Sequence, residues 1–205
     1  IGLPMGFQFS ITAIGSIFLQ SELNKFGAFA IAGFSSAQKV EHLVTIAANT
    51  IGVASANFTG QNIGAKNILR VKQGVKSCLL ISLICAGISM AIALIFPKEL
   101  TSLFVSLNTP GYNQVLDCAK EFLFWCSLCF FPLYCIFIFR NTLQAMGYAF
   151  IPLLGGLTEL LCRTIVAITL PKLIGYTGIC LAGSIAWLLT SLLLVVSYFI
   201  IIKRR

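Results

Sequence analysis

Charged residues are scarce in this sequence of 205 residues. They make up 10% of the chain, with 6 acidic residues and 1 histidine, whereas 58% of the residues are hydrophobic. A soluble domain carries about 25% charged residues, because its surface faces water. The scarcity therefore excludes an ordinary soluble domain and indicates that lipid surrounds most of the surface.

Patterns that carry chemistry are also lacking. The net charge of +8 suggests nucleic acid, but the basic residues lie at the ends of apolar runs and form no basic face. No Ser/His/Asp set or phosphate-binding G-x-x-x-x-G-K-[ST] loop is present. Cys126-Ser-Leu-Cys129 spells C-x-x-C, but it lies in an apolar stretch with no second ligand pair, so we interpret both cysteines as packing residues. We expect no enzyme activity, cofactor, metal site or nucleic-acid partner.

Long apolar segments are what the sequence does contain. About 20 apolar residues cross a hydrocarbon core of about 30 Å, and the segments that meet this test lie near 3–23, 27–57, 72–96, 115–139, 149–171 and 178–202. Inside lipid each backbone amide needs a partner within its own segment, so these spans are predicted to be helices. Pro4, Pro132 and Pro152 each remove a backbone donor and can kink the first, fourth and fifth of them. The expected fold is an all-α integral membrane bundle of six helices, with a short interfacial helix within 97–114.

The basic residues predict the orientation in the membrane. The connections on one side hold Lys66, Arg70, Lys72, Lys76, Arg140, Lys203, Arg204 and Arg205, whereas those on the other side hold Lys25, Lys98, Lys120 and Lys172. Positive residues favour the cytoplasmic side. We expect a multi-pass protein of the plasma (inner) membrane whose chain start and C-terminus are cytoplasmic.

The first span carries a polar stripe. Gln8, Thr12, Ser16 and Gln20 recur at intervals of four and so share one helical face. In lipid such a stripe faces other helices or water. It predicts either interhelical hydrogen bonds or the lining of a solute pathway, with Gln8 and Thr12 as pathway candidates.

The second span carries charges near its middle, in Gln38-Lys39-Val40-Glu41-His42. Spacings of three and four place Gln38, Glu41, His42, Thr45 and Asn49 on one face, and Lys39 flanks it. Charges at mid-membrane cost several kcal/mol and mark ion or substrate pathways. We favour a pathway over a structural ion pair. Glu41 is the candidate that binds a coupling cation or proton, and His42 could share the proton.

Two further motifs are weaker on the residues alone. Glu159 and Arg163 are spaced i, i+4 within the fifth span, which predicts a structural ion pair, or else a secondary site. Gly60-Gln61-Asn62-Ile63-Gly64-Ala65 follows the second span, and its glycines permit a tight turn between helices.

At this last segment the sequence resembles a known family. Gly60, Gln61, Asn62, Gly64 and Ala65, closing a long second helix, resemble the multidrug and toxic compound extrusion (MATE) exporters. The similarity extends to Gly2-Leu3-Pro4, to 139–147 (Phe-Arg-Asn-Thr-Leu-Gln-Ala-Met-Gly), to Glu159 with Arg163, and to Trp187. It implies helices seven to twelve of a twelve-helix protein, its C-terminal lobe. The N-terminal lobe of the same polypeptide would lie outside this sequence, which starts within an apolar segment and reads as a fragment.

The resemblance also implies a function. Small organic compounds, often cationic, would leave the cell by alternating access in exchange for sodium ions or protons. Some branches of the family have a carboxylate seven residues after the proline of helix seven, where this chain has Ile11. Their cation site cannot be carried over, so coupling would rest on Glu41, on Glu159 or on the other lobe. The alternatives are a flippase of the same superfamily that moves lipid-linked sugars, which needs several basic residues in its cavity, and a non-transporting membrane scaffold.

Overall fold

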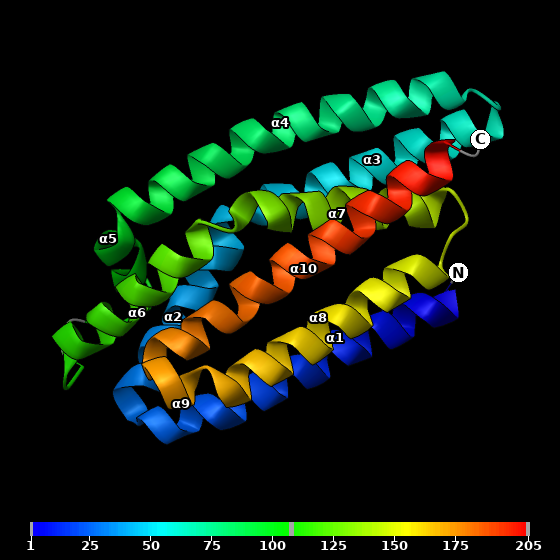
Figure 1. Cartoon of the computed structure of the whole chain (residues 1–205). Helices are drawn as coiled ribbons and strands as arrows, with labels where there is room; N and C mark the ends of the chain where they lie inside the picture. The colour runs from blue at the N-terminus through cyan, green and yellow to red at the C-terminus, as the bar shows by residue number, and fades with distance from the viewer. Residues whose placement is uncertain (1, 107–108, 204–205) are drawn as a thin grey trace.

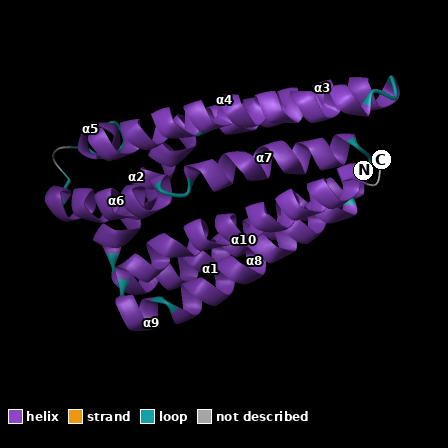
Figure 2. Cartoon of the chain, turned by 45° about the horizontal axis from the view of Figure 1, so that its top comes forward, coloured by secondary structure: helices purple, strands orange, loops and turns teal. Residues whose placement is uncertain are grey.

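The computed structural model describes residues 2–106 and 109–203, and every regular element in these ranges is a helix (Figure 2). In chain order the elements are α1 (Gly2–Leu23), the 3-10 helix η1 (Asn24–Phe26), α2 (Ala28–Val44), α3 (Ile46–Gly64), α4 (Ile68–Ile95), α5 (Pro97–Ser102), α6 (Tyr112–Ser127), α7 (Phe130–Ala145), α8 (Phe150–Thr169), α9 (Pro171–Ile174) and α10 (Tyr176–Lys203).

The helices lie roughly side by side in one elongated bundle (Figure 1). The first and last described residues lie at one end, together with the α3–α4 and α7–α8 connections; we call this the terminal end. The other end, which we call the far end, holds η1, α5 and α9. The basic connections of the sequence belong to the terminal end, which is therefore the predicted cytoplasmic end.

Length and composition identify fewer spans than the sequence suggested. Among the described residues, three stretches are long and apolar enough to cross a membrane: Ile68–Ile95, Phe150–Ile174 and Tyr176–Lys203. A fourth is added if α6 and α7, bent by 55°, count as one broken span. The second predicted span does not qualify because it is divided, and α3 carries polar residues such as Asn49, Asn57 and Gln61.

Two spans that were predicted as continuous helices are broken. The second divides between α2 and α3 at Thr45, whose φ and ψ of −102° and 6° leave the helical region. The fourth divides between α6 and α7, three residues before Pro132. A proline ring clashes with the carbonyl four residues earlier, here that of Leu128, which explains this break.

Side-chain and backbone donors satisfy carbonyl groups at the break of the second span. The amide and the Oγ1 of Thr45 both donate to the Glu41 carbonyl, at 2.9 and 2.7 Å. Ser89 of α4 donates through Oγ to the Val44 carbonyl at 2.5 Å, and the same Oγ lies 3.2 Å from the Tyr134 hydroxyl oxygen. Unpaired backbone groups cost several kcal/mol each in lipid. These bonds therefore allow a helix break inside the bundle.

Glycines permit close contact between the broken spans. α2 packs against α6, and α3 packs against α7. A Cβ atom added at Gly33 of α2 would lie 2.6 Å from the Val115 carbonyl oxygen, and one at Gly52 of α3 would lie 2.9 Å from that of Phe137. Small residues at helix contacts let backbones approach closely. The two halves of each broken span are thus held by their counterparts in the other.

The turn after the second span lies later than predicted. Gly60 to Gly64 belong to the last turns of α3, and the turn is made by Ala65, Lys66 and Asn67. Lys66 takes the left-handed conformation, with a φ of 56°. The Asn67 side chain then caps α4 by accepting a bond of 3.1 Å from the Arg70 amide. The motif thus ends a helix, and its glycines are not the turn residues.

Candidate functional site

A cavity of about 540 Å³ opens between the broken spans and the helices α1, α8 and α10. We call it the Glu41 cavity. Its polar lining comes from Ser16, Gln38, Glu41, His42, Thr45, Asn49, Arg140, Glu159, Arg163 and Ser184. Apolar side chains such as Leu19, Phe34 and Trp187 complete the wall. Pockets for small ligands commonly have volumes of about 300–1,000 Å³, with a few polar groups in an apolar wall.

Glu41 lies in the last turn of α2, directly before the break at Thr45. Glu41 is 7% exposed, and its carboxylate makes no ion pair with any residue that the structure describes. Glu159 and Arg163 line the same cavity. The helix break therefore places a buried acidic group, with charges nearby but no direct counter-ion, in the cavity wall.

The second buried carboxylate of the cavity is held by two arginines. Glu159 of α8 accepts through Oε1 from Arg163 Nη2 at 2.7 Å, and through Oε2 from Arg140 Nη2 at 3.1 Å. The exposed fractions of these side chains are 8% for Glu159, 11% for Arg163 and 15% for Arg140. The i, i+4 ion pair expected from the sequence is present, and a third charge from α7 joins it.

Arg140 is the site residue that sequence reasoning missed. The predicted fourth span ended at residue 139, so Arg140 counted among the basic residues of a connection. The structure continues α7 to Ala145 and turns Arg140 inward. Nothing in the local sequence pairs it with Glu159, 19 positions away. The only signal was a lone arginine directly after an apolar run.

The structure gathers most of the predicted pathway residues in one place. Gln38, Glu41, His42, Thr45 and Asn49 line the Glu41 cavity, together with Glu159 and Arg163. The side chains of Gln8 and Thr12 lie outside the described residues. Of the rest of their stripe, Ser16 lines the cavity, whereas the Gln20 amide donates to the Asn24 side chain at 3.3 Å.

Lys39 departs from the grouping that the sequence suggested. Its side chain is exposed and is not part of the cavity lining. Its Nζ lies 5.8 Å from the centroid of the Phe104 ring, in the segment after α5 at the far end. A lysine has a long flexible stem, and its ammonium group is attracted to the face of an aromatic ring. Lys39, which the sequence placed at the flank of the polar face, therefore lies apart from the Glu41 cavity.

A helical membrane bundle with broken spans around a charged cavity is typical of secondary transporters. The sequence model of the MatE family matches residues 4–169 of this chain. The chain therefore belongs to the MATE family of transporters.

Similar curated proteins come from Bacillus subtilis (strain 168). The probable multidrug resistance protein YpnP is 24% identical over 148 residues, which cover 72% of this chain and 32% of YpnP. The probable multidrug resistance protein YoeA is 26% identical over 106 residues, which cover 52% of this chain and 23% of YoeA. The chain thus matches about a third or less of each relative's length.

Solved structures have the same fold. A mutant of the Vibrio cholerae MATE transporter VcmN superposes with a TM-score of 0.89 at 16% identity, covering 98% of this chain and 45% of that one. A MOP superfamily transporter from Pyrococcus furiosus gives a TM-score of 0.86 at 17% identity, covering 98% and 44%. The predicted all-α membrane fold, one six-helix lobe of a MATE-type transporter, is confirmed. The family is one of transporters rather than enzymes.

Proposed function

We propose that the chain forms the C-terminal lobe of an exporter of small organic, often cationic compounds. The N-terminal lobe of the same polypeptide would close the Glu41 cavity from the other side. Sodium ions or protons would enter in exchange, across the plasma (inner) membrane, with the terminal end in the cytoplasm. Membership of the MATE family and the multidrug resistance relatives support this proposal.

The proposal rests on one observation, the buried carboxylate of Glu41. A buried carboxylate without a counter-ion costs several kcal/mol in a membrane unless a ligand or water compensates it. The other buried carboxylate of the cavity already has Arg140 and Arg163. Glu41 is therefore the acidic group with the capacity to take up an incoming cation, in a cavity of a suitable size for one.

A single carboxylate also gives a physical reason for exchange. When a sodium ion or proton occupies Glu41, its negative charge is cancelled and an organic cation gains nothing from approaching it. When the ion leaves, the carboxylate attracts the organic cation, and at low dielectric this attraction is strong. Two cations that compete for one group bind alternately. Alternating binding, combined with alternating access, produces antiport.

The cavity fits a flippase of lipid-linked sugars less well. Such a substrate carries phosphates, which need basic side chains. Arg140 and Arg163 both bond Glu159, and Lys39 lies outside the cavity. A scaffold without transport has no need for an unpaired Glu41 at a helix break.

The test is gradient-driven uptake of ethidium, an organic cation, into everted membrane vesicles that contain the full-length protein. Glu41→Gln keeps the shape of the side chain and removes its charge, so gradient-driven ethidium movement should fall to the level of vesicles without the protein. Glu99→Gln, an exposed residue of α5, is the matched control and should transport normally. Lys39→Gln should also keep its activity.

Normal ethidium transport by Glu41→Gln at equal protein abundance would refute the proposed role of Glu41. The coupling ion is identified in the same vesicles by imposing a sodium gradient and a pH gradient separately. Transport that responds to neither gradient would contradict cation-coupled antiport itself.

A further inference from the structure

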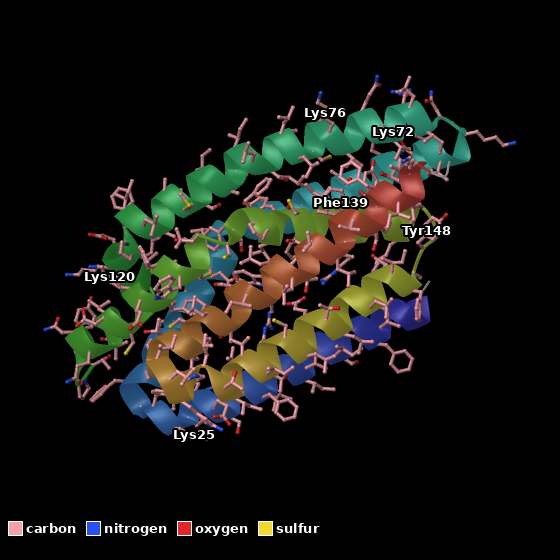
Figure 3. All side chains as sticks on the ribbon, in the orientation of Figure 1. Lys25, Lys72, Lys76, Lys120, Phe139 and Tyr148 are labelled. Atoms are coloured by element: carbon pink, nitrogen blue, oxygen red, sulfur yellow. The ribbon has the colours of Figure 1, made fainter. Side chains whose placement is uncertain are left out.

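A second cavity lies near the terminal end of the bundle. It has a volume of about 570 Å³ and runs between α4 and α10. Both helices pack against α7, which lies beneath the gap. We call this cavity the α4–α10 groove. Figure 3 shows two of its residues, Lys72 and Lys76, along α4 toward the terminal end, far from Lys25 and Lys120.

The walls of the groove are apolar. Val75 and Leu79 of α4 and Phe199 of α10 line it. Tyr198 also lines it, and this ring is 3% exposed and packs on Phe139 of α7, with a centroid separation of 5.1 Å. An aromatic layer thus closes the bottom of the groove. Such a surface suits a hydrocarbon chain.

Three lysines edge the same groove: Lys72 and Lys76 from α4 and Lys203 from α10. All three side chains are exposed. The acidic residues of the sequence are Glu22, Glu41, Glu99, Asp117, Glu121 and Glu159, and none of them falls in α3, α4, α7 or α10. No ion pair with a described residue involves the three lysines. The groove therefore combines an apolar interior with a cluster of uncompensated positive charge.

We propose that the α4–α10 groove binds an anionic phospholipid. Its phosphate would lie among Lys72, Lys76 and Lys203, and one acyl chain would lie along the apolar walls. The exposed residues next to the groove, such as Leu80 on α4 and Ile200 on α10, are large and apolar, so this side faces lipid. A lipid can enter the groove from its leaflet without leaving the bilayer. Basic pockets between membrane helices on the cytoplasmic side recognise anionic headgroups.

Binding of two lipids with the same acyl chains tests the proposal. Dioleoylphosphatidylglycerol and dioleoylphosphatidylcholine are titrated onto the purified full-length protein in detergent, and bound lipid is counted by native mass spectrometry. Each lysine near an anionic lipid contributes about five-fold in affinity, so three contribute on the order of 100-fold. The wild type should prefer phosphatidylglycerol by up to that factor.

The charge-removing variant is K72Q/K76Q/K203Q, which should bind the two lipids about equally. The matched control is K98Q/K120Q/K172Q, which removes the same charge from exposed lysines outside the groove and should keep the preference. K72R/K76R/K203R should also keep it, which separates charge from damage to the fold. Because these measurements need no transport, they are independent of the proposed exporter function.

The results that would overturn the proposal are equally distinct. An unchanged preference in K72Q/K76Q/K203Q places the lipid elsewhere, and an equal loss in K98Q/K120Q/K172Q reduces the effect to net charge. Displacement of phosphatidylglycerol by millimolar inorganic phosphate would show a headgroup site that makes no use of the acyl chain. The proposal requires that free phosphate leaves the lipid bound.

Discussion

Replacing Glu159 should destabilise the protein more than replacing either of the arginines bonded to it. Glu159→Gln is nearly isosteric, so it creates no cavity and removes only the charge. It leaves Arg140 and Arg163 facing the same space, with 15% and 11% of their side chains exposed. Arg163→Gln, in contrast, leaves Glu159 with Arg140 as its partner.

The expected loss follows from this burial. Removing one partner of a buried ion pair costs about 3–5 kcal/mol, because the remaining charge is uncompensated. For a chain of this length each kcal/mol lowers Tm by about 2–4 °C, so Glu159→Gln should melt roughly 6–20 °C below the wild type. The double variant Glu159→Gln/Arg163→Gln should recover part of that loss, since one of the two cations that repel each other at this place is then removed as well.

Thermal unfolding of the purified protein in detergent measures these differences. The fluorescence of Trp125 and Trp187 reports on unfolding, and Trp187 lines the Glu41 cavity. Glu99→Gln serves as the control, because an exposed charge contributes little. The reasoning fails if Glu159→Gln melts within about 2 °C of the wild type, which corresponds to less than about 1 kcal/mol. It also fails if the double variant is less stable than the single one.

Two further substitutions test the broken spans by thermal unfolding. Ser89→Ala removes the donor to the Val44 carbonyl and should cost about 1–3 kcal/mol, whereas Ser77→Ala, exposed on the same helix, should change stability by less than about 0.5 kcal/mol. Equal effects at the two serines would contradict a role for Ser89 in the break. Gly33→Ala would place a Cβ 2.6 Å from the Val115 carbonyl oxygen and should cost about 1–3 kcal/mol. As the control, a Cβ added at Gly87 meets nothing within 4 Å, so Gly87→Ala should raise the free energy of unfolding by about 0.5–1 kcal/mol. If Gly33→Ala were as stable as the wild type, α2 and α6 would not be in close contact.

Hydropathy predicted the parts of the fold that are uninterrupted apolar helices. The runs near 72–96 and 178–202 are apolar throughout, and continuous helices occupy 68–95 and 176–203. The break at Thr45 could not be found in this way, because no proline or glycine marks it. The Val44 carbonyl at this break accepts a hydrogen bond from Ser89, which is distant in the sequence. Pro132 did give a local signal for the other break.

Residues of the site that share one helix could be grouped from the sequence, whereas contacts between residues of different helices could not. Helical spacing brought Gln38, Glu41 and Thr45 onto one face, and all three line the cavity. The partnership of Arg140 with Glu159 joins different helices, and the direction of Lys39 depends on Phe104, which lies 65 positions further along the chain. Such pairs are set by packing, on which a single sequence carries no information.

The two helix breaks have a mechanical consequence. A continuous helix transmits bending along its length, whereas a broken one transmits it poorly. Here two neighbouring spans are interrupted, and Ser89 contacts both of them close to the interruptions. The segments α2 and α6 on one side of the breaks pack together, as do α3 and α7 on the other. A tilt of the first pair against the second would move Glu41 while Glu159 stayed in place, so the distance between the two carboxylates would change with the tilt.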